Sequence, residues 1–120
     1  MGRRGGRSLS AHLNPDEASF QSVVVEVARL AGWKVAHFRA ARTAKGWRTP
    51  VTADGAGWPD LVLVRPPRIA FAELKSDGGK LRPSQSEWLD VLRLLPQVET
   101  YLWRPKDWDS LVETLTGSRP

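Results

Sequence analysis

Two acidic residues and a lysine stand at the ends of two short apolar runs. Pro59-Asp60 precedes the run Leu61–Val64, and Glu73-Leu74-Lys75 follows the run Ile69–Ala72. The segment between the runs is rich in Pro and Arg, and this pattern is typical of an antiparallel β-hairpin. Pairing the two strands returns Asp60 and Glu73 to the same edge. The spacing therefore predicts two carboxylates that share one cation.

Lys75 belongs to the same expected site. Side chains alternate along a strand, so Glu73 and Lys75 point the same way while Leu74 points into the core. Oxygen ligands with no Cys or His nearby favour Mg²⁺, with Mn²⁺ as a substitute. Such an ion acts as a Lewis acid on a phosphate ester and lowers the pKa of a bound water, while Lys75 orients that water or neutralises developing charge. The expected chemistry is phosphodiester hydrolysis.

These residues resemble a known nuclease signature. Gly57-Trp58-Pro59-Asp60 with Glu73-Leu74-Lys75 is similar to the PD-(D/E)XK superfamily, and most similar to its VRR-NUC branch. The branch also has counterparts of Glu17 and Gln21 in a first helix, of the turn Gly79-Lys80-Leu81, and of Gln85 in a later helix. The resemblance covers roughly residues 16 to 108. It implies Asp60, Glu73, Lys75, Glu17 and Gln85 as catalytic residues, and Asp60, Glu73, Glu17 and the Leu74 backbone carbonyl as metal ligands.

Simpler interpretations of the same residues stay open. Acidic residues often flank a hairpin, and Lys75 could pair with Glu73 on a solvated face. An acidic residue in the first turn stabilises any helix, which would account for Glu17 without a metal. Gln85 could be an ordinary exposed side chain. Glu26 is a rival carboxylate on the first helix, and we expect it to face solvent.

Composition agrees with a small DNA-binding enzyme. The chain has 120 residues, 41% of them hydrophobic with six Trp, which suits a single domain with its own core. A formal net charge of +5, from 18 basic and 13 acidic residues, fits a polyanionic partner. The sequence has no Cys, no signal-peptide pattern and no apolar run long enough to span a bilayer. We expect a soluble protein of the cytoplasm, and the resemblance implies a bacterial or phage-infected cell.

The N-terminal segment differs from the rest of the chain. Residues 1–13 are rich in Gly, Arg and Ser, and they carry Arg3, Arg4 and Arg7. We expect a flexible basic arm, because the segment has too few apolar residues to fold alone. Contact with DNA phosphates and an inert terminus are equally compatible with this composition. A single nuclease domain is expected over residues 14–116.

The first helix should begin at Pro15, capped by Asn14, and run to about Ala31. Its expected buried stripe consists of Phe20, Val23, Val24, Val27 and Leu30. Gly32 then ends the helix before a strand over Trp33–Arg39, whose His37 and Arg39 could face the site. Glu17 and Gln21 lie one turn apart and project beyond the helix N-terminus.

Residues 40–57 show no clear hydrophobic period, and we expect a long loop. The segment is basic and contains Trp47, so it could grip a DNA backbone or stack on a base. The nucleic-acid-binding residues expected here and in the turn after Lys75 are Arg39, Arg42, Lys45, Trp47, Arg48 and Lys80.

Later segments complete the expected fold. A glycine turn over residues 76–80 leads to a helix over Pro83–Leu95, with Trp88, Leu89, Val91, Leu92 and Leu95 on its apolar face. A strand over Val98–Trp103 and a helix over Asp107–Leu115 follow. The resulting fold is α/β, a restriction-endonuclease-like αβββαβ core with a central mixed sheet flanked by helices and an extra C-terminal helix.

The sequence therefore predicts a Mg²⁺-dependent DNA endonuclease. The resemblance implies branched DNA such as a Holliday junction as substrate, and symmetric junction cutting would favour a homodimer. Two other classes stay open: a catalytically silent DNA-binding module of the same fold, and a non-enzymatic protein-interaction domain suggested by the six Trp and the basic surface.

Overall fold

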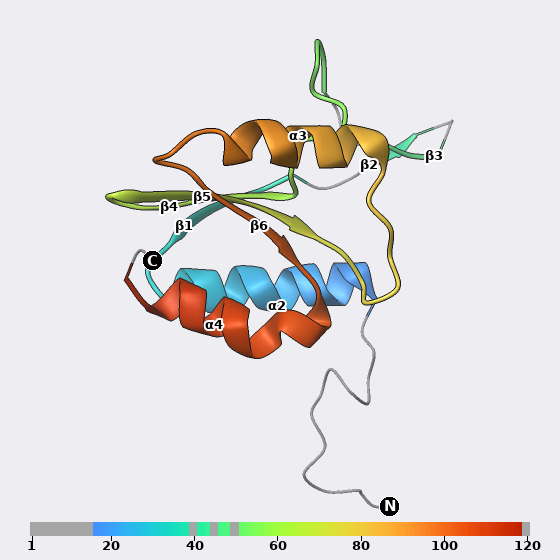
Figure 1. Ribbon diagram of the computed structural model, residues 1–120. Coiled ribbons are helices and arrows are strands. Elements are labelled where there is room, and N and C mark those ends of the chain that lie inside the picture. Colours follow the sequence, from blue (N-terminus) through green and yellow to red (C-terminus); the bar gives the residue numbers. More distant parts are fainter. Residues whose placement is uncertain (1–15, 39–40, 44–45, 49–50, 119–120) are drawn as a thin grey trace, which may run out of the picture.

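The protein forms an α/β sandwich built on a four-stranded sheet (Figure 1). The structure is a computed structural model that describes residues 16–38, 41–43, 46–48 and 51–118. In chain order the elements are α2 (Glu17–Leu30), β1 (Lys34–His37), β2 (Ala41–Thr43), β3 (Gly46–Arg48), β4 (Leu61–Arg65), β5 (Arg68–Leu74), α3 (Pro83–Arg93), β6 (Glu99–Trp103), the 3₁₀ turn η1 (Pro105–Asp107) and α4 (Trp108–Thr116). The expected N-terminal arm lies outside the described residues.

The main sheet has the strand order β1-β4-β5-β6. Strands β1, β4 and β5 pair antiparallel, whereas β6 runs parallel to β5. A parallel pair needs a crossover, and α3 supplies it on one face of the sheet while α2 and α4 cover the other (Figure 1). The mixed sheet flanked by helices confirms the predicted fold class.

The central hairpin has the predicted strands, each slightly longer than expected. Leu61 pairs with Ala72 and Arg65 pairs with Arg68, so Pro66 and Pro67 form the turn. Leu61, Leu63 and the even-numbered residues Ala70, Ala72 and Leu74 are buried on the α2 and α4 face. The opposite residues, Phe71 and Glu73 among them, therefore face α3. This alternation fixes the side on which the acidic residues lie.

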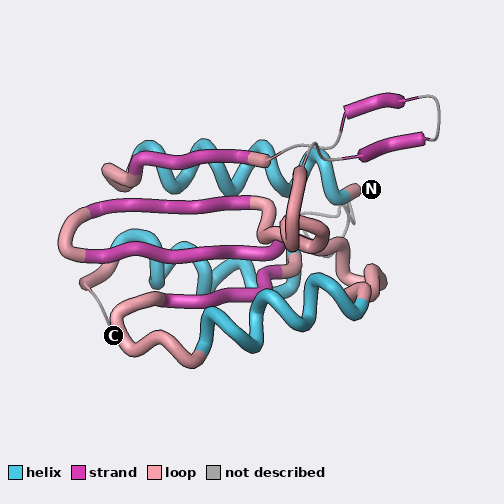
Figure 2. The backbone as a smooth tube through the Cα atoms, turned by 90° about the horizontal axis from the view of Figure 1, so that it is seen from above, coloured by secondary structure: helices cyan, strands magenta, loops and turns pink. Residues whose placement is uncertain are grey.

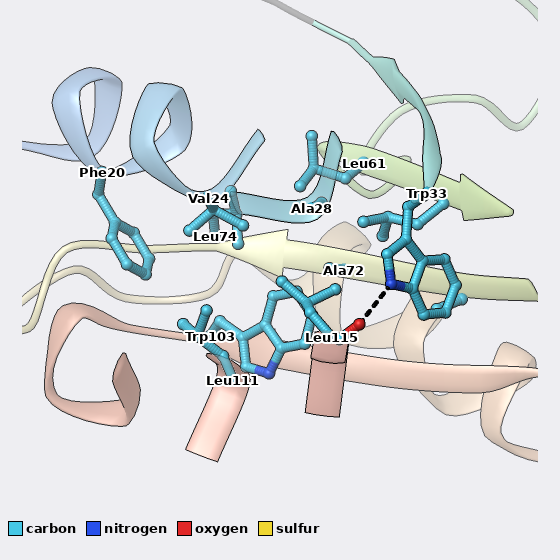
Figure 3. Close-up of a cluster of buried hydrophobic side chains, with 12 residues drawn as sticks. Phe20, Val24, Ala28, Trp33, Leu61, Ala72, Leu74, Trp103, Leu111 and Leu115 are labelled. Carbon is cyan, nitrogen blue, oxygen red and sulfur yellow. Dashed lines mark hydrogen bonds between the residues drawn. The ribbon is translucent and has the colours of Figure 1, made fainter. Parts of the chain in front are cut away.

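The core lies between the sheet and the helix pair α2 and α4 (Figure 3). Phe20, Val24 and Ala28 of α2 pack against the hairpin, and Leu111 and Leu115 of α4 close the other side. The indole of Trp33 donates a hydrogen bond of 2.8 Å to the Leu115 carbonyl, which ties the residue before β1 to the last turn of α4 (Figure 3).

Two expectations for α2 were wrong. The helix begins at Glu17 and not at Pro15, and its cap is Asp16 and not Asn14. The Asp16 side chain accepts a hydrogen bond of 2.8 Å from the Ser19 amide. The buried stripe is narrower than predicted, because Val23 is 44% exposed and Leu30 is 83% exposed. Helix α2 instead buries Ala28, whose small side chain allows close approach to the sheet. Gly32 has a φ of +94°, the left-handed conformation that a helix-ending glycine adopts.

The prediction of an unstructured loop over residues 40–57 was also wrong in part. Strands β2 and β3 form a separate two-stranded hairpin, in which Arg42 lies opposite Trp47. This hairpin stands apart from the main sheet (Figure 2). Residues 51–60 then return to β4 through turns.

The C-terminal elements start and end close to their predicted positions. Helix α3 ends at Arg93 and buries Leu89 and Leu92, while Val91 and Leu95 are exposed, contrary to the predicted apolar face. Strand β1 is shorter than expected, and a 3₁₀ turn precedes α4.

Candidate active site

Asp60 and Glu73 lie opposite each other at one end of the central hairpin. The register pairs Leu61 with Ala72, so the next position places Asp60 beside Glu73. One carboxylate oxygen of Asp60 accepts a hydrogen bond of 2.8 Å from the Leu74 amide. This bond fixes Asp60 against the strand that carries Glu73. The two carboxylates therefore meet where the hairpin pattern places them.

Glu73 is buried far more deeply than a surface ion pair would require. Its residue is only 1% exposed, and Oε2 accepts a hydrogen bond of 2.9 Å from Nε2 of Gln85. The Lys75 ammonium lies 3.8 Å from the same oxygen. The other oxygen, Oε1, is buried with no hydrogen-bond partner among the described residues. A buried carboxylate oxygen without a partner is costly, and a bound cation would satisfy it.

Burial makes both carboxyl groups hard to ionise without a cation. Loss of solvent raises the pKa of Asp60 to about 6, an effect that the Leu74 amide partly opposes. Burial, together with the nearby charge of Asp60, raises the pKa of Glu73 to about 8. Lys75 counteracts part of this rise. Two adjacent acids with raised pKa values form a site that favours a divalent cation.

Glu17 lies near this pair without joining it. Its negative charge raises the pKa of both Asp60 and Glu73. Oε2 of Glu17 is 3.5 Å from the amide nitrogen of Gln21, whose oxygen lies 3.0 Å from Nε2 of His37. Within the described part of the chain, no three His, Cys, Asp or Glu side chains converge on one point. The role of Glu17 as a metal ligand stays a prediction.

The residues present fit a hard divalent cation. Asp60 and Glu73 supply carboxylate oxygens, and Mg²⁺ commonly uses one or two protein carboxylates together with water and substrate phosphate. The partnerless oxygen of Glu73 provides the structural argument for such an ion. The Leu74 carbonyl stays a predicted further ligand.

Gln85 connects Glu73 to the start of α3. While its Nε2 donates to Glu73, its Oε1 accepts a hydrogen bond of 2.9 Å from the Arg82 amide. Gln85 is buried, so the interpretation of an ordinary exposed glutamine was wrong. The sequence alone did not show that one side-chain amide would both cap α3 and hold the Glu73 carboxylate.

Gly57 allows the turn before Asp60 to touch α3. Its φ is +85°, and a Cβ atom there would lie 2.4 Å from the Ser84 carbonyl carbon and 2.7 Å from the Gln85 amide nitrogen. We expect Gly57→Ala to destabilise the protein by about 2–3 kcal/mol, because it adds both a clash and backbone strain. Thermal unfolding measures this loss.

Gly78 offers the matched control for this substitution. A Cβ at Gly78 would meet no atom within 4 Å, so Gly78→Ala should change stability by less than about 0.5 kcal/mol. Equal melting temperatures for the two variants would show that the close approach of Gly57 to α3 does not contribute to stability.

Arg104 holds the turn that follows Lys75. Its guanidinium donates hydrogen bonds of 2.7 Å to the Ser76 carbonyl and 2.6 Å to the Gly79 carbonyl. The Lys75 amide donates to the Trp103 carbonyl at 3.0 Å. Arg104 is half-buried, and its hydrogen bonds give it a structural role in this turn.

The expected DNA-binding residues divide into three groups. Arg39 and Lys45 lie outside the described residues, and Arg42, Trp47 and Arg48 belong to the β2–β3 hairpin. Lys80 is exposed in the turn between the site and α3.

Comparison with known proteins agrees with this arrangement. The family model of the VRR-NUC domain matches residues 15–99. The chain belongs to the VRR-NUC family. A solved structure described as a VRR_NUC domain is 23% identical, has a TM-score of 0.59, and is matched over 81% of this chain and 94% of that one. At this identity, the structural likeness supports the fold alone. No curated protein matches the chain.

Membership in the VRR-NUC family makes this chain a nuclease-type domain, with DNA as the implied partner. The matched region contains Asp60, Glu73, Lys75 and Gln85, together with Glu17. Among the described helices, none is long and apolar enough to cross a membrane.

Proposed function

We propose that this chain is a Mg²⁺-dependent DNA endonuclease, in which Asp60 and Glu73 hold the ion and Lys75 assists the attacking water. The observation that supports this most directly is the buried Glu73 oxygen without a partner, on the carboxylate opposite Asp60. A bound divalent ion would supply a Lewis acid for the phosphate and lower the pKa of a water molecule. The Leu74 carbonyl and Glu17 would complete the site.

The protein's own groups hold this geometry in place. The Leu74 amide orients Asp60, and the Gln85 amide group orients Glu73. Lys75 would place its positive charge beside the phosphate and offset the negative charge that develops during hydrolysis. Because these groups are fixed by main-chain contacts and helix α3, little rearrangement is needed before reaction.

Branched DNA is the substrate we propose, on the basis of the family resemblance. Four-way junctions would require two symmetric cuts, which a homodimer provides. The β2–β3 hairpin would contact the DNA beside the cleavage site.

The deciding experiment compares cleavage of matched four-way junction, flap and linear duplex DNA. Wild type and Asp60→Asn are each tested with Mg²⁺, Mn²⁺ or EDTA. Asn keeps an oxygen for the Leu74 amide but removes the charge, so the variant should fold and fail to cut. Metal-dependent cutting by wild type alone supports the proposal. DNA binding without cutting by either protein would support a silent DNA-binding module instead.

Lys75→Met should reduce the single-turnover cleavage rate by about 10²–10³-fold and DNA affinity by less than about threefold, because Lys75 acts on the reacting phosphate. Rapid-quench cleavage and fluorescence anisotropy measure the two quantities. Lys80→Met provides the contrast, since an exposed lysine in the next turn should affect affinity and its salt dependence more than the rate. Parallel losses of rate and affinity in Lys75→Met would assign Lys75 to phosphate anchoring.

A further inference from the structure

Phe38, Asp60 and Glu73 lie side by side across the sheet, and these three positions form one row. The register pairs His37 with Leu61, so Phe38 falls beside Asp60, and the Phe38 amide donates a hydrogen bond of 2.8 Å to the Asp60 carbonyl. Asp60 in turn falls beside Glu73. Neighbouring strands are about 4.8 Å apart, so the Phe38 backbone is one strand away from Asp60 and two from Glu73.

The Phe38 ring is on the α3 face, the face of Glu73. It makes an edge-to-face contact with Trp58, with ring centroids 6.1 Å apart. Trp58 also contacts Phe71 at 5.5 Å and Trp88 of α3 at 4.9 Å. The Trp88 indole donates hydrogen bonds to the carbonyls of Asp54 and Ala56. This aromatic cluster, Phe38, Trp58, Phe71 and Trp88, holds the ring in a fixed place beside the site.

Phe38 nevertheless keeps part of its surface open to solvent. The residue is 38% exposed, whereas Trp58, which it contacts, is half-buried. Helix α3 lies beside β6, and β1 forms the opposite edge of the sheet (Figure 2). A rigid aromatic ring with a solvent-accessible surface next to two metal-binding carboxylates is suited to base stacking, since every base has a π-face.

We propose that Phe38 is a stacking platform for an unpaired nucleobase next to the phosphate that is cut. This inference rests on the proposed nuclease function and names its substrate class, DNA with an unpaired nucleotide at the cleavage position. Bases inside a duplex are already stacked on both sides, so only an unpaired or splayed base can lie on Phe38. Single-stranded arms and branch points provide such bases.

The test pairs a protein substitution with the removal of one base. Binding of a labelled splayed-arm DNA is measured in EDTA by fluorescence anisotropy, so that no cleavage is needed. An abasic residue is placed in turn at each nucleotide around the fork. With wild type, one position should raise Kd by about 10-fold, within the range of about 5- to 150-fold that a stacked base contributes.

Phe38→Leu should raise Kd for intact DNA by a similar factor, and the abasic residue at that position should then have no further effect. Phe38→Trp should restore both the affinity and the sensitivity to the missing base. Leu94→Ala, which changes an exposed apolar residue outside the row, should behave as wild type. Thermal unfolding of each variant identifies any loss of the folded state.

Equal sensitivity to the missing base in wild type and Phe38→Leu would overturn the stacking proposal, as would a wild type that responds to no abasic position. If that same wild type still cuts DNA with Mg²⁺, and Asp60→Asn does not, the nuclease function stands. A wild type that neither binds nor cuts any DNA would overturn both proposals.

Discussion

Glu73→Gln should abolish Mg²⁺-dependent cleavage, with a loss of at least about 10³-fold in rate. Glu73 supplies a buried carboxylate oxygen that has no hydrogen-bond partner within the described chain, and a glutamine amide cannot replace its charge at a cation. Electrostatic stabilisation by a metal contributes several kcal/mol, and each 1.36 kcal/mol corresponds to about tenfold in rate. Single-turnover cleavage at saturating protein measures the loss.

The same substitution should stabilise the metal-free protein at alkaline pH. Burial and the neighbouring charge of Asp60 raise the pKa of Glu73 from an ordinary value of 4.5 to about 8. The folded state therefore holds its proton more tightly than the unfolded state. The contribution of Glu73 to the free energy of unfolding is fully present below pH 4.5, and it is lost as the pH rises through about 8. At pH 9, the free energy of unfolding of Glu73→Gln should exceed that of wild type by about 2–4 kcal/mol.

Glu87→Gln, an exposed Glu on α3, provides the control for both measurements. It should change neither cleavage nor the dependence of melting temperature on pH. Adding Mg²⁺ at pH 8 should stabilise wild type and leave Glu73→Gln unchanged, because only wild type offers the full carboxylate pair. A Glu73→Gln variant that cuts DNA, or that is less stable than wild type at pH 9, would contradict the assignment of Glu73.

Glu99→Gln should destabilise the protein by about 3–5 kcal/mol, because it leaves the buried Arg68 guanidinium without a counter-charge. Arg68 donates to both carboxylate oxygens of Glu99, at 2.7 and 2.6 Å, and both residues are buried. Arg68 also lies over the Trp33 ring at 4.7 Å, and Tyr101 donates to Glu99 at 2.6 Å. Chemical denaturation measures the change in the free energy of unfolding.

An exposed ion pair on α3 provides the comparison. Arg93 and Asp90 approach to 3.4 Å in solvent, so Asp90→Asn should cost less than about 0.5 kcal/mol. If Glu99→Gln and Asp90→Asn unfolded at the same denaturant concentration, the buried ion pair would contribute no more to stability than the exposed one. That result would contradict the prediction. Cleavage by Glu99→Gln below its melting temperature should match wild type, because the pair lies away from the site.

The central hairpin could be predicted from sequence because the residues that determine it are close together in the chain. Two β-prone runs around Pro66-Pro67 fix both the turn and the register, and the register brings Asp60 beside Glu73. The burial of Glu73 could not be predicted in this way. It depends on α3, whose Gln85 reaches back across a turn that Arg104 holds in place.

Other errors also come from contacts distant in sequence. Val23, Val24, Val25 and Val27 form an almost continuous apolar run, so periodicity alone could not choose which face of α2 packs on the sheet. The β2–β3 hairpin has short strands without alternation, which resembles a loop in sequence. The aromatic cluster around Trp58 brings together three strand or turn residues and a helix residue, and no spacing rule connects them.

The position of the central hairpin in the chain affects how the sequence of such a domain can vary in evolution. Asp60, Glu73 and Lys75 all belong to one contiguous segment of chain, whereas Phe38 and the β2–β3 hairpin come from the segment before it. Under the proposed function, substitutions, insertions or deletions in the β2–β3 hairpin would alter which DNA is held and leave Asp60, Glu73 and Lys75 in place. The proposed DNA contacts and these three residues occupy separate stretches of the chain, so each could diversify while the other stays constant, whereas Glu17 of α2 precedes both stretches.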